Sequence, residues 1–210
     1  MQPKSIYEDI AQVYLRLNNF FLTPNLVIEL DRHPLEIDII AYRPKGATEY
    51  LTSNRRLEID KDFFNLLTPK GTIDGLNIAL ICDVKGESQK LWRADNPKHI
   101  EVKITHPLTL FGINTSKKEV RRMTRELIKN GTYRYKELII ALVGFAKEST
   151  RKPHFSTSTE VKHIIIPIEH ALNFIINRIK KVKEKERAII HYPNISFKTL
   201  ILLHRTKLLK

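Results

Sequence analysis

Apolar and polar residues follow each other along the chain with two different periods, and these periods predict its helices and strands. Helical spacing marks three segments, at residues 3–19, 116–130 and 168 to about 187. Strand-like runs occupy residues 25–30, 36–42, 76–85, 99–106, 136–145 and 160–168. Helices and strands in this order predict an α/β fold around a mixed central β-sheet.

The run at 76–85 stands out because successive residues, which point to opposite faces of a strand, are both apolar. This predicts a central strand covered on both faces. The run at 99–106 alternates instead, as a half-exposed strand does. Residues 44–76 are polar and interrupted by prolines and glycines, with one short helix-like piece, KDFFNLL. We therefore predict a single domain over residues 1–210. It carries an insertion at about 44–76 and a C-terminal helical extension at about 168–210.

The composition narrows the class of protein. A chain of 210 residues with 42% hydrophobic and 28% charged residues has the values of a globular protein. Its first residues lack the apolar segment of a secretory signal, and no apolar run reaches the roughly 18 residues of a membrane helix. Cys82 is the single cysteine and cannot form an intrachain disulfide, which fits a reducing compartment. We expect a soluble, cytoplasmic protein with no membrane partner.

The charge favours a polyanionic partner. The formal net charge is +13 and the pI about 9.8, and a basic protein that neutralises phosphates gains free energy by releasing counterions. A generally basic surface, as in heat-adapted proteins, is the alternative. The second predicted helix adds a basic stripe that could follow a phosphate backbone, although a solvated helix face would look similar. The stripe consists of Lys117, Lys118, Arg121, Arg122, Arg125 and Lys129.

An acid, a valine and a lysine occur in this order three times, and only one copy follows a buried strand. The three copies are Asp83-Val84-Lys85, Glu101-Val102-Lys103 and Glu160-Val161-Lys162. On a strand the acid and the lysine share one face. In the second and third copies that face is expected to be solvated. Burying Asp83 unpaired would cost several kcal/mol, so Lys85 or another cation must lie near it. The pair is either a structural salt bridge or part of a site at the carboxyl end of the strand.

Asp38 favours the second interpretation, because it interrupts an apolar strand in the same way. If the strands of Asp38 and Asp83 are neighbours, two carboxylates converge and repel each other unless a divalent cation lies between them. Magnesium is held by one or two carboxylates together with waters and phosphate oxygens. Lys85 could then orient or deprotonate a water, or stabilise the charge of a phosphoryl transition state.

The segments YEDIAQVYLRLNNF, EIDIIAY and ICDVK together resemble the PD-(D/E)xK nuclease superfamily, and are most similar to its small Holliday-junction-resolvase-like members. The resemblance implies a three-layer α/β/α restriction-endonuclease-like core that hydrolyses DNA phosphodiester bonds with Mg²⁺ or Mn²⁺. Asp38 and Asp83 match the metal ligands, with the Val84 carbonyl as a third. Lys85 matches the catalytic lysine, and Glu8 matches the glutamate of the first helix, which acts on the metal directly or through water.

The chain departs from the family pattern in three places. The insertion lengthens a hairpin that is tight in compact members, position 83 is Asp rather than the commoner Glu, and Ile37 replaces the proline that often precedes the first aspartate. Glu8 has a competing interpretation as part of a helix cap, with Asp9 as the alternative acid.

The expected function is a metal-dependent DNA endonuclease or exonuclease that uses Mg²⁺ or Mn²⁺ and no nucleotide cofactor, in repair, recombination or restriction. A homodimer would suit the cutting of two strands. The main alternative is a catalytically inactive nucleic-acid-binding module of the same fold, acting as a subunit of a larger complex. A basic RNA-binding protein with structural acids is a third interpretation.

Overall fold

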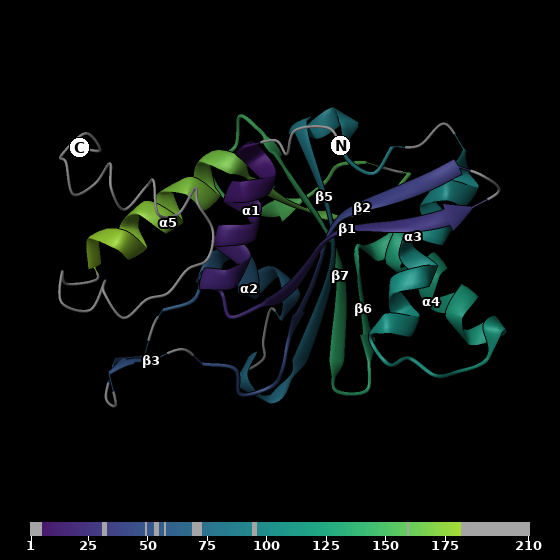
Figure 1. The fold of residues 1–210 in the computed structure, drawn as a ribbon, viewed down its shortest axis with the longest axis horizontal. Coiled ribbons are helices and arrows are strands. Elements are labelled where there is room, and N and C mark those ends of the chain that lie inside the picture. The colour runs from purple at the N-terminus through teal and green to yellow at the C-terminus, as the bar shows by residue number, and fades with distance from the viewer. Residues whose placement is uncertain are drawn as a thin grey trace.

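A twisted, mixed β-sheet forms the centre of the molecule, and helices cover both of its faces (Figure 1). The predicted α/β class is therefore confirmed. The computed structural model describes residues 6–30, 33–48, 50–52, 55–56, 58–68, 73–93, 96–158 and 160–181. The predicted end of the last helix near residue 187 and the rest of the predicted C-terminal extension lie outside these residues.

The sheet has seven strands in the described residues, ordered β1-β2-β5-β7-β9-β8, with β6 paired to the first half of β7. β5 pairs antiparallel with β2 and parallel with β7, so the predicted central strand is central. β3 and β4 form a separate pair within the predicted insertion. The strands are β1 (Phe21–Leu30), β2 (His33–Arg43), β3 (Tyr50–Thr52), β4 (Arg55–Arg56), β5 (Asn77–Glu87), β6 (Thr132–Tyr135), β7 (Leu138–Lys147), β8 (His154–Phe155) and β9 (Ile164–Pro167).

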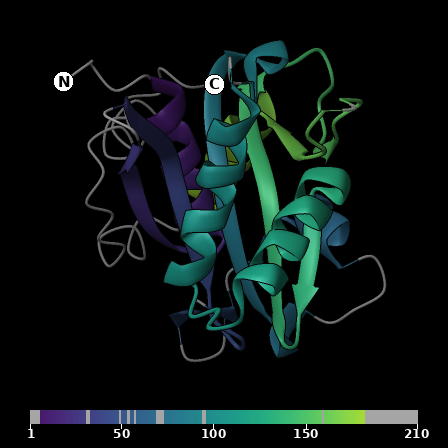
Figure 2. The same cartoon turned by 90° about the vertical axis from the view of Figure 1, so that its right-hand side faces the viewer.

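Helices α1, α2 and α5 pack on one face of the sheet, while α3 and α4 lie together on the other (Figure 2). The helix predicted from the KDFFNLL segment forms as α2, and its buried phenylalanines make it part of the core. The helices are α1 (Ile6–Leu17), α2 (Lys61–Leu67), α3 (Pro97–Leu110), α4 (Lys117–Asn130) and α5 (Ile168–Lys181).

The strand predicted at 99–106 is wrong, because this segment is part of α3. Asn96 caps the helix by accepting a hydrogen bond from the Lys98 amide, and Pro97 occupies the first turn, where its missing N–H costs nothing. The isoleucines at 100 and 104 fit a helical spacing of four as well as an alternation of two. The strand predicted from residue 160 also begins later, at Ile164.

The hairpin of β1 and β2 changes sides of the sheet along its length. Ile39 packs with α1, whereas Ile37, only two residues earlier, packs with α3 and α4. Regular alternation would put both on one face. Asp38 lies at this crossing. The register of the hairpin places it opposite Asn25, whose φ of 53° is left-handed. Asp38 also directly precedes Ile39, at which the pairing of β2 with β5 ends.

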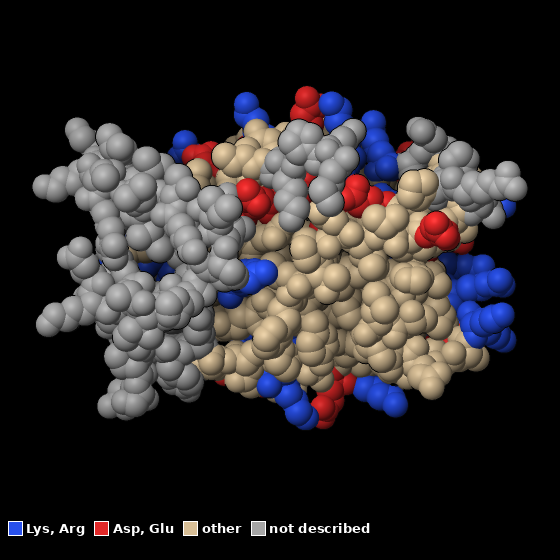
Figure 3. Space-filling model, in the orientation of Figure 1, with Lys and Arg blue, Asp and Glu red and all other residues tan. Residues whose placement is uncertain are grey.

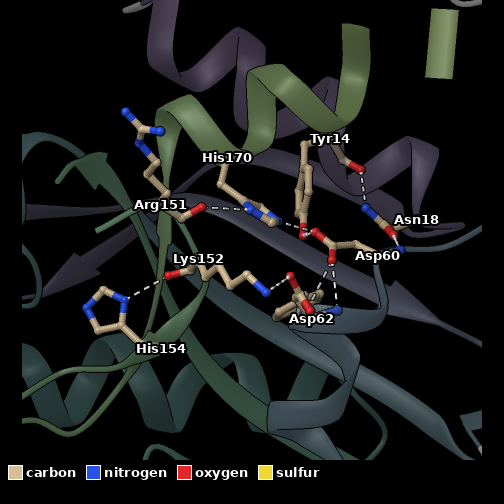
Figure 4. Close-up of polar contacts among 9 residues, drawn as sticks. Tyr14, Asn18, Asp60, Asp62, Arg151, Lys152, His154 and His170 are labelled. Carbon is tan, nitrogen blue, oxygen red and sulfur yellow. Dashed lines mark hydrogen bonds and ion pairs between the residues drawn. The ribbon is translucent and has the colours of Figure 1, made fainter. Parts of the chain in front are cut away.

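A buried carboxylate joins the helices on the α1 face (Figure 4). Asp60 accepts hydrogen bonds from the Tyr14 hydroxyl and from His170 Nε2, both at 2.6 Å, and caps α2 through its other oxygen. The second nitrogen of His170 lies 3.1 Å from the Arg151 carbonyl. Since neither partner of His170 can donate, both ring nitrogens must, and the imidazole is a cation. Asp60 and His170 therefore form a buried ion pair that ties α1, α2 and α5 together.

Candidate functional site

Two of the predicted acids meet at the predicted lysine. Lys85 Nζ lies 3.1 Å from Asp38 Oδ2 and 2.8 Å from Asp83 Oδ1. The β2–β5 ladder ends at Ile39 and Cys82, and continuing its register by one residue puts Asp38 opposite Asp83. The side chains of Asp38 and Asp83 are only 12% and 10% exposed, whereas that of Lys85 is 38% exposed. The carboxylates thus lie close enough to share one cation at a site that solvent reaches.

Backbone amides fix both carboxylates. The Val84 amide donates to Asp38 Oδ2 at 2.6 Å, and the Trp92 amide donates to Asp83 Oδ2 at 2.7 Å. Trp92 has a left-handed φ of 54°, which is uncommon for a bulky residue and indicates that its surroundings hold the turn in place. The carboxylates are therefore oriented by groups outside the ion pair itself.

Gly144 allows the Trp92 turn to reach Asp83. In the parallel register of β5 and β7, Gly144 is the neighbour of Asp83. A Cβ atom at this position would stand 2.5 Å from Leu91 Cδ1, so the absence of a side chain lets Leu91 pack directly on the strand. The next residue is Trp92, whose amide then lies against the carboxylate. This contact explains a glycine inside an otherwise fully buried strand.

Burial and neighbouring charges shift the pKa values of Asp38 and Lys85 in the cluster. Burial raises the pKa of the Asp38 carboxyl to about 6, against the opposing effect of Lys85 and with a further contribution from the charge of Asp83. Burial alone would lower the pKa of Lys85, but Asp83 and Asp38 raise it well above its ordinary value. Lys85 thus stays protonated and is a poor general base.

A small cavity of about 30 Å³ opens beside Asp83 and Lys85, with room for a water. Glu36, Arg93 and Lys103 also line it. Sequence patterns did not assign these three residues to the site. Lys103 belongs to a triplet that the pattern placed on a solvated strand face, and the helix α3 brings it to the cavity instead. No spacing rule links Arg93 to β5, because the turn at Trp92 determines where it lies.

Glu8 lies on a different element from the other predicted ligands. It is in the first turn of α1, a helix on which Ala11 and Leu15 are buried. That helix packs on the face opposite to the one on which Asp83 and Trp92 lie. In the described part of the chain, no three His, Cys, Asp or Glu residues are grouped so that they could hold a metal. The roles of Glu8 and of the Val84 carbonyl stay predictions.

The predicted basic stripe forms on α4. Ser116 caps the helix, and Gly131 ends it with a left-handed φ of 75°, as the sequence indicated. All six basic side chains are exposed, although Arg122 is paired with Glu119 at 2.6 Å. Figure 3 shows Lys and Arg side chains at the right-hand edge of the molecule, beside α4 in the view of Figure 1. The stripe therefore presents charge to solvent at the α3–α4 side of the sheet.

Within the residues that the structure describes, no helix is both long and apolar enough to cross a membrane. Comparison of the chain with protein families, curated proteins and solved structures finds no match.

Proposed function

We propose that the chain is a metal-dependent deoxyribonuclease of the PD-(D/E)xK type, with a site formed by Asp38, Asp83 and Lys85. The observation that carries this proposal is the contact of both carboxylates with a single ammonium at the end of the central strand. The order of elements is compatible with it as well. Leaving out the predicted insertion and the short strand β6, the chain runs through α1, the antiparallel strands β1, β2 and β5, the helices α3 and α4, and the strand β7, which is parallel to β5.

The donor set fits Mg²⁺ or Mn²⁺. Two carboxylates are enough protein ligands for Mg²⁺, which takes its remaining oxygens from waters and from phosphate. Burial and the neighbouring Asp83 charge raise the pKa of Asp38, and a bound cation would stabilise its ionised form. Asp38 and Asp83 would hold the metal, with Glu8 and the Val84 carbonyl as the further ligands that the resemblance implies. When bound, the metal supplies a Lewis acid for the phosphate.

In the proposed reaction, water adds to phosphorus while the bond from phosphorus to one sugar oxygen breaks. The leaving oxygen takes up a proton, so the products are a phosphomonoester and a free hydroxyl. Lys85 remains a cation, because its pKa is raised, and would orient the water or stabilise the charge that develops on the phosphate. The stripe on α4 would hold more distant phosphates of the same DNA.

A second candidate is the inactive DNA-binding module. It is favoured by the ion pair itself, because Lys85 already bridges the two acids. In that case the cluster would close the sheet end as a structural salt bridge, and DNA would contact only the basic surface. The two candidates differ in whether the protein cleaves DNA at all, and the nuclease also requires that cleavage depend on the two acids.

The deciding experiment incubates the protein with branched, single-stranded and duplex DNA, with and without Mg²⁺ or Mn²⁺. Asp83→Asn and Lys85→Ala should each reduce cleavage by at least about 100-fold, a typical effect of removing one electrostatic group from an active site. Asp83→Asn keeps an oxygen that can accept the Trp92 amide, so the fold should be retained. Binding to DNA without cleavage of any substrate would support the inactive module instead.

The other triplets supply matched controls. Glu101→Ala removes an acid and Lys162→Ala a lysine from the same local sequence, at positions outside the cluster. Both variants should cleave like the wild type. Equal losses in the control variants and in the site variants would contradict the proposed site.

A further inference from the structure

A larger hollow lies next to the candidate site and shares part of its wall. It has a volume of about 660 Å³, within the range of roughly 300–1,000 Å³ that is typical of small-molecule sites. Trp92 and Arg93 line both this hollow and the small cavity beside Asp83 and Lys85. The turn after β5 and the segments on either side of β8 form its other walls. A molecule in the hollow would therefore lie within reach of the candidate reaction centre.

The lining favours an uncharged group with many hydrogen-bonding atoms. Hydroxyl side chains from both walls face the hollow, among them Ser88 and Thr157, and each can donate as well as accept. Glu148 and Glu160 are acids that would repel a phosphate, whereas Arg93 is the one arginine or lysine among the described lining residues. A nucleobase matches this chemistry. Its phosphate would lie outside the hollow, toward Arg93 and Lys85.

Two of the lining residues also carry polar atoms without partners. Trp92 and His163 are 5% and 3% exposed, and neither Trp92 Nε1 nor His163 Nε2 has a hydrogen-bond partner within the described structure. The other ring nitrogen of His163, Nδ1, lies 2.8 Å from the Val161 carbonyl. Nδ1 therefore donates, and Nε2 is left as the acceptor of the neutral ring. Buried polar atoms are hydrogen-bonded in most proteins, so this donor and this acceptor are unsatisfied groups in the wall of the hollow, although neither nitrogen is open to solvent.

We propose that this hollow binds one nucleobase of an unpaired DNA segment, next to the phosphate held at Asp38, Asp83 and Lys85. The inference rests on the proposed nuclease function and deepens it by naming the substrate class. A base inside a duplex is stacked and paired, so it can enter a pocket only from a single strand, an end or a distorted site. The preferred substrate is therefore DNA with a single-stranded or unpaired segment.

Trp92 makes the binding step measurable, because it is the only tryptophan of the chain and lines the hollow. The full-length protein is titrated in EDTA with a single-stranded oligonucleotide and with an abasic oligonucleotide of the same length. A base bound in the hollow should change the fluorescence of Trp92 in its wall and should make the ordinary oligonucleotide bind at least about fivefold more tightly, the lower end of what one base contributes. Equal affinities without a fluorescence change would overturn the proposal.

Filling the hollow provides the matched variants. Thr157→Phe, or Gln89→Phe if the first variant does not fold, places a ring at the exposed wall and should abolish both the preference and the fluorescence change. Ser149→Phe changes an exposed residue outside the lining and should behave like the wild type. Base-selective binding that survives both filling variants would place the base elsewhere and refute the proposal.

Cleavage in Mg²⁺ separates this inference from the proposed function. If the protein cleaves DNA but binds abasic and ordinary strands equally, the nuclease assignment stands and the base pocket is wrong. If binding is base-selective and sensitive to Thr157→Phe but no DNA is cleaved, the pocket stands and the nuclease assignment is wrong.

Discussion

Replacing Asp60 by asparagine should destabilise the protein by about 2 to 3 kcal/mol in its free energy of unfolding. The carboxylate accepts hydrogen bonds from Tyr14 and from the His170 cation, and Asp60 is only 5% exposed. A hydrogen bond to a charged group contributes about 1.5–3 kcal/mol, and a neutral one about 0.5–1.5 kcal/mol. Asp60→Asn is nearly isosteric, but its amide has only one oxygen, so the variant must lose either the cap of α2 or the bonds from Tyr14 and His170, and denaturant unfolding measures the cost.

The destabilisation should also depend on pH. Burial alone would lower the pKa of His170, but its hydrogen bond to Asp60 and the charge of Asp60 raise it above 6.5. Burial would raise the pKa of Asp60, but His170 and Tyr14 lower it below 3.8. A raised histidine pKa stabilises the fold below the unfolded value and loses this contribution as pH rises through the folded value. The Asp60→Asn effect should therefore be largest between about pH 4 and pH 6.5.

Asp62→Asn is the control, because Asp62 lies in the same turn but its side chain is 45% exposed and is paired with Lys152 at 3.4 Å. An exposed pair of this kind contributes about 0–1 kcal/mol. Equal destabilisation by the two substitutions, or an Asp60→Asn effect of the same size at about pH 5.5 and pH 9, would refute the buried ion pair.

Four further predictions concern the candidate site and the basic helix. Gly144→Ala should destabilise the protein by about 1–3 kcal/mol through overpacking, and adding Leu91→Ala should relieve this strain in a double-mutant cycle of unfolding free energies. Additive effects would contradict the contact. Mg²⁺ should raise the melting temperature more at about pH 7.5 than at about pH 5, because the Asp38 carboxyl, with a pKa of about 6, must be deprotonated to bind. In metal-free buffer the same raised pKa makes stability fall as pH rises from 3.8 to about 6, and Asp38→Asn should remove this slope. A metal effect that is the same at both pH values would speak against Asp38 as a ligand. Arg121→Gln combined with Arg125→Gln should lower the slope of log affinity for duplex DNA against log salt by about 2. An unchanged slope would exclude α4 from the DNA contact.

Much of the fold could be predicted from the sequence because its elements carry strong local patterns. The buried run that became β5 contains no polar residue between Ile78 and Cys82, and α4 has an N-terminal serine cap and a C-terminal glycine. The segment at 99–106 was mispredicted because its isoleucines satisfy both periods. The cap at Asn96 and the packing of this segment against the sheet favour the helix over the strand. The strands β6 and β8 pair with the strands that follow them, but at four and two residues they are too short to carry a local signature.

The residues of the candidate site that interrupt an apolar strand could be predicted from the sequence. The residues that reach the site from other segments through the tertiary fold could not. Asp38 and Asp83 were visible because a charge inside an apolar strand requires a partner. Arg93 and Lys103 reach the cavity through the turn at Trp92 and the path of α3, and no sequence spacing encodes that path. The large hollow is likewise assembled from segments that lie more than fifty residues apart in the chain.

The hairpin of β1 and β2 contributes to the hydrophobic cores on both faces of the sheet. On one side of Asp38, Ile39 packs in the core under α1, and on the other side, Ile37 packs in the core under α3 and α4. Opening of either face would remove part of the packing that holds Asp38 beside Lys85. The candidate site therefore depends on both layers of helices, and not only on the one nearest to it.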